Sequence, residues 1–102
     1  MSNTVVVKGG RAYRADIKTG SNKGSVGGSN VVDGDSDGDY IVLVYANGRA
    51  KRYDANTGSE KGSVGSSGVA SCTISSGTIV LKYENGRSHR YDAKTGSDKG
   101  SI

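Results

Sequence analysis

The run Asp33-Gly34-Asp35-Ser36-Asp37-Gly38-Asp39 places carboxylates at alternate positions among glycines. Calcium loops begin in this way, because Ca²⁺ takes several carboxylate oxygens around a tight turn. The glutamate that an EF-hand carries at its twelfth position is missing, and Val44 stands there. Asp33, Asp35 and Asp37 are therefore candidate calcium ligands. The alternative is a solvated turn whose charges discourage pairing between strand edges.

Three rows of basic residues recur at one constant spacing along the chain. They are Arg11, Arg49 and Arg87; Arg14, Arg52 and Arg90; and Lys23, Lys61 and Lys99. Such rows could follow a phosphate backbone, with Tyr53 or Tyr91 as a stacking surface. Asp16, Asp54 and Asp92 recur two residues after the second arginine row. Residues two apart share a face of a strand, so we favour an arginine–aspartate ladder that links the repeats over nucleic-acid binding.

No set of residues predicts catalysis. His89 is the only histidine and replaces Lys51 and Tyr13 at its repeat position, which favours a surface role. Cys72 has no histidine or basic cluster near it in sequence, which indicates a small buried thiol. The glycine-rich residues 24–28 lack the lysine of a P-loop. We therefore predict that the protein is not an enzyme and holds no cofactor besides the possible calcium.

A 38-residue repeat must position these side chains. Gly-Arg pairs begin at Gly10, Gly48 and Gly86, and Thr-Gly-Ser triplets recur at the same spacing without insertion or deletion between them. One repeat domain, residues 1–102, therefore contains copies at about 2–39, 40–77 and 78–102.

Each copy divides into strands at turn signals. Residues 41–45 form a continuous apolar run, as expected for a strand that is buried on both faces. Asn47-Gly48 predicts a type I′ hairpin, and strands should follow at residues 49–54, 60–64 and 69–74. The protein is therefore predicted to be all-β, with antiparallel meanders of three, then four, then four strands.

Tyr91-Asp92-Ala93-Lys94-Thr95-Gly96 resembles the signature of the quinoprotein-like (PQQ-type) β-propeller repeat. In that family an Asp and a Thr-Gly mark the hairpin before the outer strand of a blade. The resemblance covers all three copies and implies propeller-like blades. The family usually has a tryptophan that docks neighbouring blades, and Gly24, Gly62 and Gly100 stand at its positions. No counterpart of the family's quinone-binding residues is found, so the resemblance implies architecture only.

The composition suggests that one chain is part of a larger object. Hydrophobic residues make up 32% of the 102 residues, with no Trp or Phe. Three blades are also fewer than the four to eight of a typical propeller. We expect that two or more chains complete a ring or a stacked assembly. The alternative closure is a three-fold β-trefoil-like barrel within one chain.

The preferred function is a non-enzymatic structural or interaction module that acts as a homo-oligomer, such as an accessory component of a phage virion. Its partners would be itself, other structural proteins or a glycan. The first alternative is a small repeat lectin, because repeated Asn, Asp, Tyr and Arg can build sugar sites. Nucleic-acid binding is the second alternative, which the net charge of +4 permits without requiring it. Neither a signal peptide nor a transmembrane run is evident, so we expect a cytoplasmic or virion location.

Overall fold

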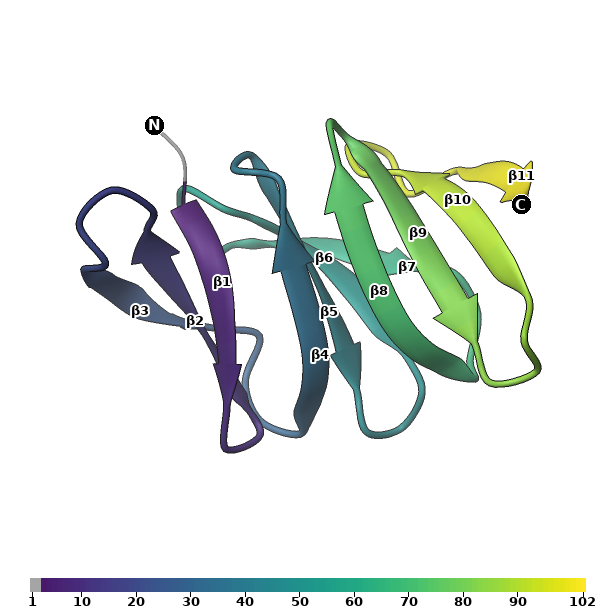
Figure 1. Cartoon of the computed structure of the whole chain (residues 1–102), viewed down its shortest axis with the longest axis horizontal. Helices are drawn as coiled ribbons and strands as arrows, with labels where there is room; N and C mark the ends of the chain where they lie inside the picture. The colour runs from purple at the N-terminus through teal and green to yellow at the C-terminus, as the bar shows by residue number, and fades with distance from the viewer. Residues whose placement is uncertain (1–2) are drawn as a thin grey trace.

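A computed structural model describes residues 3–102 as eleven strands in three separate antiparallel sheets, here called blades 1, 2 and 3. Blade 1 comprises β1 (Asn3–Lys8), β2 (Arg11–Asp16) and β3 (Asn22–Val26). Blade 2 comprises β4 (Val31–Ser36), β5 (Tyr40–Tyr45), β6 (Ala50–Asp54) and β7 (Glu60–Val64). Blade 3 comprises β8 (Val69–Ser75), β9 (Thr78–Tyr83), β10 (Ser88–Asp92) and β11 (Asp98–Ser101). The predicted three, four and four strands are confirmed (Figure 1). The barrel alternative is wrong, because the eleven strands form three separate sheets and not one closed barrel.

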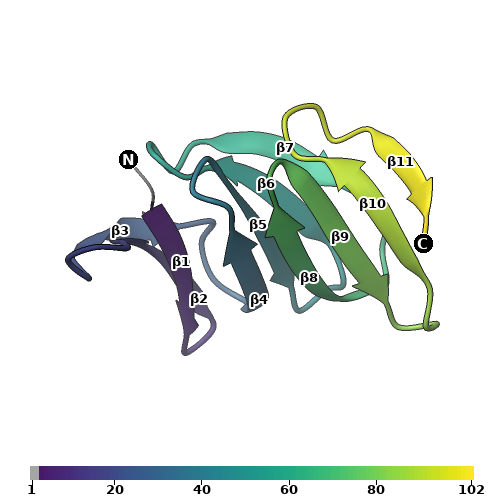
Figure 2. The same cartoon turned by 45° about the horizontal axis from the view of Figure 1, so that its top comes forward.

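The blades do not coincide with the sequence copies. The fourth strand of each copy pairs forward, so β4 joins β5 and β8 joins β9. β4 and β8 become the inner strands of their blades and lie side by side, as Figures 1 and 2 show. β3, β7 and β11 are the outer strands. The blade boundaries therefore fall in the linkers, at residues 27–30 and 65–68.

The hairpins that join the first two strands of a copy differ between copies. Gly48 has φ +83° and its N–H donates to the Tyr45 carbonyl at 2.9 Å, whereas Asn47 is not among the residues with positive φ. The predicted type I′ turn is therefore wrong here. In this loop of three residues only the last, Gly48, is left-handed, which is the pattern of a type I turn followed by a left-handed glycine. In blade 1 the loop has only two residues, Gly9 and Gly10, and both have positive φ.

This shorter loop shifts β1 by one residue against the repeat. Val5 pairs with Arg14 in blade 1, as Val42 pairs with Arg52 in blade 2. The interval from Val5 to Val42 is thus one residue shorter than the interval from Arg14 to Arg52. The expected unbroken register therefore holds from the Gly-Arg pair onward and fails for the strand before it.

The hydrophobic core lies between the blades. Ile41 and Leu43 of β5 pack with residues of blade 1, whereas Val42 and Val44 pack against blade 3. All four side chains are fully buried, which confirms the prediction of a strand buried on both faces. Burial of each such side chain stabilises the fold by roughly 1.5–3 kcal/mol. Blade 2 is thus the centre of the molecule.

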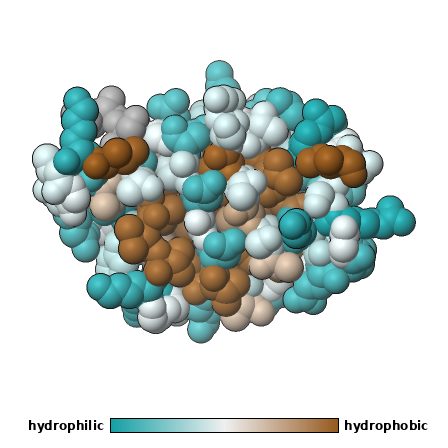
Figure 3. All heavy atoms as spheres, viewed as in Figure 1, coloured by the Kyte–Doolittle hydropathy of each residue, from teal (hydrophilic) through white to brown (hydrophobic). Residues whose placement is uncertain are grey.

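The two end blades each leave one face open. On blade 1, Val6 is 46% exposed and Ile17 is 58% exposed, although the equivalent Leu43 and Ala55 of blade 2 are fully buried. In Figure 3, which has the view of Figure 1, apolar residues lie over the place of β1, and further groups lie over the middle of the molecule and over blade 3. On blade 3, Lys82 and Arg90 are exposed on the face that points away from blade 2. These faces could accept further blades.

Candidate functional site

An arginine of one blade binds the hairpin of the next. The Arg14 Nη1 atom donates to the Asn56 carbonyl at 2.8 Å, and its Nη2 atom donates to the Lys23 carbonyl of its own blade at 3.0 Å. The guanidinium lies against Gly58, where an added Cβ would be 3.0 Å from Nε. A side chain at this position would press against the guanidinium, and the φ of +79° also favours glycine.

Arg52 makes the same contact between blades 2 and 3. Its Nη1 atom donates to the carbonyls of Ala93 and Lys94, each at 3.0 Å, and its Nη2 atom donates to the Lys61 carbonyl at 2.9 Å. The side chain is only 6% exposed and lies against Gly96. Arg52 thus holds two blades together through main-chain oxygens.

Arg90, the third member of this row, has only the contact within its own blade. Its Nη2 atom donates to the Lys99 carbonyl at 2.8 Å, and the side chain is exposed. We call Arg14, Arg52 and Arg90 the docking arginines. The first two link blades as predicted, but their partners are carbonyls, and no arginine–carboxylate ion pair occurs within residues 3–102. The predicted arginine–aspartate ladder is therefore wrong in its acceptor.

The docking arginines explain the missing tryptophans. Gly24, Gly62 and Gly100 lie beneath the three guanidinium groups, and a Cβ added there would be 3.7, 3.2 and 3.6 Å from an Nη2 atom. A large side chain at these positions would compete with the arginine for the same space. The guanidinium is planar and carries several N–H donors. It can therefore fill the space between two blades and bind carbonyl oxygens of both blades at once.

Asp16, Asp54 and Asp92 stabilise the hairpin turns, two of which receive the arginines. In the Asp54 turn, the carboxylate accepts hydrogen bonds from the N–H groups of Asn56 and Thr57 at 2.7 and 3.0 Å. The other two turns have the same pair of bonds. The bond from the threonine N–H is the main reason that the pKa of each aspartate lies below its usual value. These residues thus preorganise the hairpins.

The predicted calcium ligands bind main-chain groups instead. The carboxylates of Asp33, Asp35 and Asp37 accept hydrogen bonds from the N–H groups of Cys72, Ile74 and Gly77 respectively, at 3.1, 2.9 and 2.7 Å. Within residues 3–102, no three acidic, histidine or cysteine side chains gather as metal ligands. The three carboxylates therefore do not converge as in a calcium loop. Asp33 and Asp35 lie on β4 and bind the open edge of β8, and Asp37 lies in the turn after β4 and binds Gly77 in the turn after β8. We call this set the carboxylate row.

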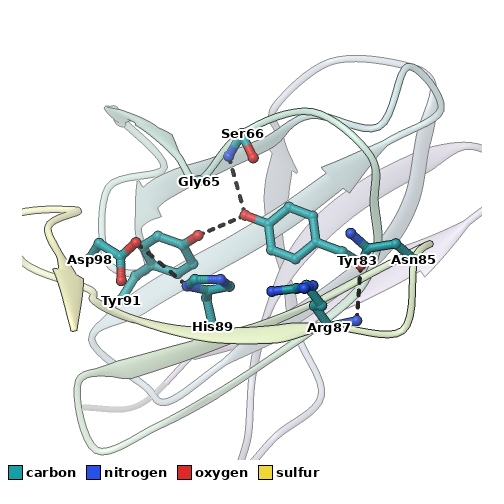
Figure 4. A pocket seen from close by; sticks show the side chains of 8 residues that line it. All are labelled: Gly65, Ser66, Tyr83, Asn85, Arg87, His89, Tyr91 and Asp98. Carbon is teal, nitrogen blue, oxygen red and sulfur yellow. Dashed lines mark hydrogen bonds and ion pairs between the residues drawn. The ribbon is translucent and has the colours of Figure 1, made fainter. Parts of the chain in front are cut away.

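A polar hollow of about 320 Å³ lies between the linker before blade 3 and the strands β9 and β10 (Figure 4). Tyr83 and Tyr91 join their hydroxyl groups at 2.7 Å, and the Ser66 N–H donates to the Tyr83 hydroxyl at 3.2 Å. His89 Nδ1 lies 3.5 Å from an oxygen of Asp98. The remaining lining residues are Gly65, Asn85 and Arg87.

A similar hollow recurs beside blade 2, where Tyr45, Asn47 and Arg49 repeat the positions of Tyr83, Asn85 and Arg87. The hydroxyls of Tyr45 and Tyr53 are 2.5 Å apart, and Tyr45 donates to the Gly27 carbonyl at 2.6 Å. Blade 1 has Lys8 and Ala15 at the tyrosine positions, so it lacks the pair.

The other predicted residues occupy varied places. The rings of Tyr53 and Tyr91 are only 4% and 6% exposed, so they offer no surface for base stacking. Burial raises the pKa of both phenols, as it does for the buried Cys72 thiol. Arg11, Arg49 and Arg87 are exposed near the hairpin tips. His89 is half-buried beside Asp98.

Sequence reasoning missed part of the hollow. Tyr45 and Tyr83 are separated by the interval of the repeat, and so are Gly27 and Gly65. A Cβ at Gly65 would be 2.5 Å from the Tyr83 hydroxyl oxygen, and Gly65 has φ +72°. This recurrence was a usable signal for a repeated site. The contact between glycine and tyrosine, which crosses from linker to strand, was not visible in the sequence.

The fold is similar to β-propellers of known structure. BamB from Moraxella catarrhalis, a propeller of the PQQ-like type, matches with a TM-score of 0.75 and 22% identity over 99% of this chain and 33% of BamB. The computationally designed propeller Ika8 matches with a TM-score of 0.75 and 21% identity over 98% of this chain and 34% of Ika8. The N-terminal domain of Nup159 matches with a TM-score of 0.65 and 12% identity, over 100% of this chain and 28% of that one.

These likenesses, together with the three blades, define the chain as a β-propeller-like repeat protein. It spans about a third of the length of BamB and of Ika8. No protein-family profile matches the sequence, and no curated protein does either. Residues 3–102 contain no helix that could span a membrane.

Proposed function

We propose that the chain is a non-enzymatic interaction module that acts as a homo-oligomer and uses the open faces of its end blades for assembly. The observation that carries this proposal is the exposure of Val6 and Ile17 on blade 1. The equivalent side chains of blade 2, Leu43 and Ala55, are fully covered by a neighbouring blade. Exposed apolar side chains grouped on one face are typical of an interaction surface.

Light scattering coupled to size-exclusion chromatography tests the proposal with the 102-residue chain. We expect a mass that is a multiple of 10.5 kDa and that falls towards one chain on dilution. If the measured mass stays that of one chain at every concentration up to the solubility limit, the proposal of a homo-oligomer is rejected. A closed ring of this kind would suit an accessory component of a larger particle such as a phage virion.

Carbohydrate binding is a second candidate function, and the hollow of blade 3 favours it. Arg87, Asn85 and Asp98 place charged and amide groups around one open site, beside the half-buried His89. Such a mixture of donors and acceptors can bind the hydroxyl groups of a sugar. A glycan array with the wild type, Asp98→Asn and Lys82→Ala tests it. Lys82 lies on the opposite face of the blade, so only Asp98→Asn should lose signal, and an empty array for the wild type would count against this function.

A further inference from the structure

We propose that Arg90 of one copy docks onto the hairpin 16–20 of a second copy, so that copies join head to tail through a contact already present twice within the chain. The inference rests on the proposed function and names the residues by which the copies meet. The two internal examples are Arg14 on the hairpin 54–58 and Arg52 on the hairpin 92–96.

The donor side of this contact is intact on blade 3. Arg90 is braced by the Lys99 carbonyl, as Arg14 is by Lys23 and Arg52 is by Lys61. A Cβ at Gly100 would be 3.6 Å from the Arg90 Nη2 atom, so the guanidinium already lies over its glycine. Its Nη1 atom has no carbonyl partner among residues 3–102. The side chain is therefore held in place for docking but lacks an acceptor.

The acceptor side is intact on blade 1. The Asp16 carboxylate accepts the N–H groups of Lys18 and Thr19 at 2.8 and 3.1 Å, which gives this hairpin the shape of the two occupied ones. Within the described part of the chain, no atom lies within 4 Å of a Cβ added at Gly20, whereas Gly58 and Gly96 each have an arginine there. The carbonyl of Lys18 corresponds to that of Asn56, which accepts from Arg14.

A hollow on the open face of blade 1 gives the guanidinium a place to enter. Val6, Tyr13, Ala15 and Gly20 are among its lining residues. Val6 and Tyr13 are paired across β1 and β2. Ile17 follows β2, and because its equivalents Ala55 and Ala93 pack towards the preceding blade, Ile17 lies on the same open face. The hollow thus lies beside the free hairpin, at the position where the arginine of a preceding blade would arrive.

Apolar contacts would accompany the arginine, although fewer than inside the chain. Ile102 is 74% exposed, while the equivalent Val64 is 2% exposed and belongs to the core between blades 2 and 3. Lys82 stands where Val44 is fully buried, and its aliphatic stem can cover apolar surface while the ammonium stays in water. We therefore expect the contact between copies to be weaker than the contact between blades.

The contact is heterologous, because one copy contributes blade 3 and the other contributes blade 1. This geometry allows a complementation experiment. Arg90→Ala removes the donor but keeps the acceptor, and Ile17→Lys blocks the acceptor but keeps the donor. Both residues are exposed in the single chain, so neither change should disturb folding. Arg87→Ala and Val32→Lys are matched controls, since Arg87 is exposed and lines the hollow on the other face of blade 3, and Val32 is 55% exposed on β4.

Sedimentation velocity of the full chain measures the outcome. Each of Arg90→Ala and Ile17→Lys should weaken self-association at least tenfold, because charged hydrogen bonds or apolar contacts at the interface are lost. An equimolar mixture of the two should form a two-chain species and nothing larger, since only one productive contact remains. The two control variants should associate as the wild type does.

Three results would overturn the inference. If the wild type is a single chain throughout, self-assembly itself fails and the proposed function fails with it. If the wild type assembles but Arg90→Ala and Ile17→Lys assemble equally well, the proposed function stands and the docking contact is wrong. A mixture that stays monomeric while both parents are monomeric would also reject head-to-tail docking.

Discussion

The arginine between two blades is the side chain that most directly holds this molecule together. It binds one carbonyl of its own blade and one or two of the next, so a single residue replaces a large aromatic contact. The row also shows a gradient, because Arg52 is buried, Arg14 is half-buried and Arg90 is exposed. The same residue type therefore contributes differently to stability in each blade.

Arg52→Ala should lower the free energy of unfolding by about 3 kcal/mol, because it leaves buried carbonyls unpaired and removes charged hydrogen bonds. Arg52→Lys should recover only part of this loss, since an ammonium cannot present the planar fork. Urea unfolding monitored by tyrosine fluorescence measures both. Arg49→Ala, at an exposed position on the adjacent hairpin, should change stability by no more than about 0.5 kcal/mol. Equal losses at Arg49 and Arg52 would contradict the docking role.

Asp54 makes stability depend on acid. Its pKa lies below the ordinary value of 3.8, so the carboxylate stabilises the fold at pH values above that value and loses this contribution as the pH falls through the folded pKa. Asp54→Asn keeps an oxygen that can accept the same N–H groups but does not titrate. Its melting temperature should therefore fall less than that of the wild type between about pH 5 and pH 2. Asp39→Asn, at an exposed position, should keep the wild-type dependence.

At the scale of the elements, the linkers between blades set the spacing of the sheets. Gly27 and Gly65 combine a positive φ with close tyrosine and leucine side chains. The same linkers carry Gly28 and Gly68, which have positive φ but open space around them. Two glycines near each other in the chain therefore face different constraints.

Gly65→Ala should destabilise the fold more than Gly68→Ala. The second change meets only the cost of a left-handed backbone, roughly 1 kcal/mol. The first also places a Cβ 2.5 Å from the Tyr83 hydroxyl oxygen and 2.6 Å from Leu81 Cδ1, which should add about 1–3 kcal/mol through overpacking. Chemical denaturation of both variants under one condition compares them. Similar losses would mean that the linker moves away from the tyrosine freely.

The strands were predictable from sequence because each ends at a turn signal and the β5 run is apolar throughout. The Asp-x-x-Thr-Gly hairpins were predictable for the same reason. The turn type of the hairpin at Asn47 was not predictable, because a loop of three residues and a loop of two residues can both be followed by the same Gly-Arg pair in the sequence. The one-residue shift of β1 follows from the shorter loop of Gly9 and Gly10 in blade 1, and it was not predicted from the sequence either. The carboxylate row was misread because its partners lie 39 or 40 residues away, on another blade's edge.

At the scale of the whole molecule, the rotation from blade to blade determines how many copies could close a ring. The chain superposes on about a third of BamB and of Ika8 over nearly its whole length. We therefore expect three copies, with nine blades in all, to span about one full turn, one blade more than the largest typical propeller.

Native mass spectrometry should then find a closed species of three chains, with three times the 10.5 kDa mass of one chain. The species should resist dilution better than a two-chain complex, because every chain in a ring makes two contacts. A main species of two chains would mean that six blades close the ring. That outcome would require a larger rotation from blade to blade than a ring of nine blades does.

The carboxylate row has a consequence for how such a chain can grow by gene duplication. Blade 2 presents carboxylates to the inner strand that follows it, whereas β8 carries Ser71, Thr73 and Ser75 at the same positions. A tandem copy of blade 2 would meet each new strand edge with acceptors and could lengthen the array. A tandem copy of blade 3 would leave the next edge unmatched. We therefore expect that duplication of the middle blade, and not of the last blade, lengthens the arrays of such proteins during evolution.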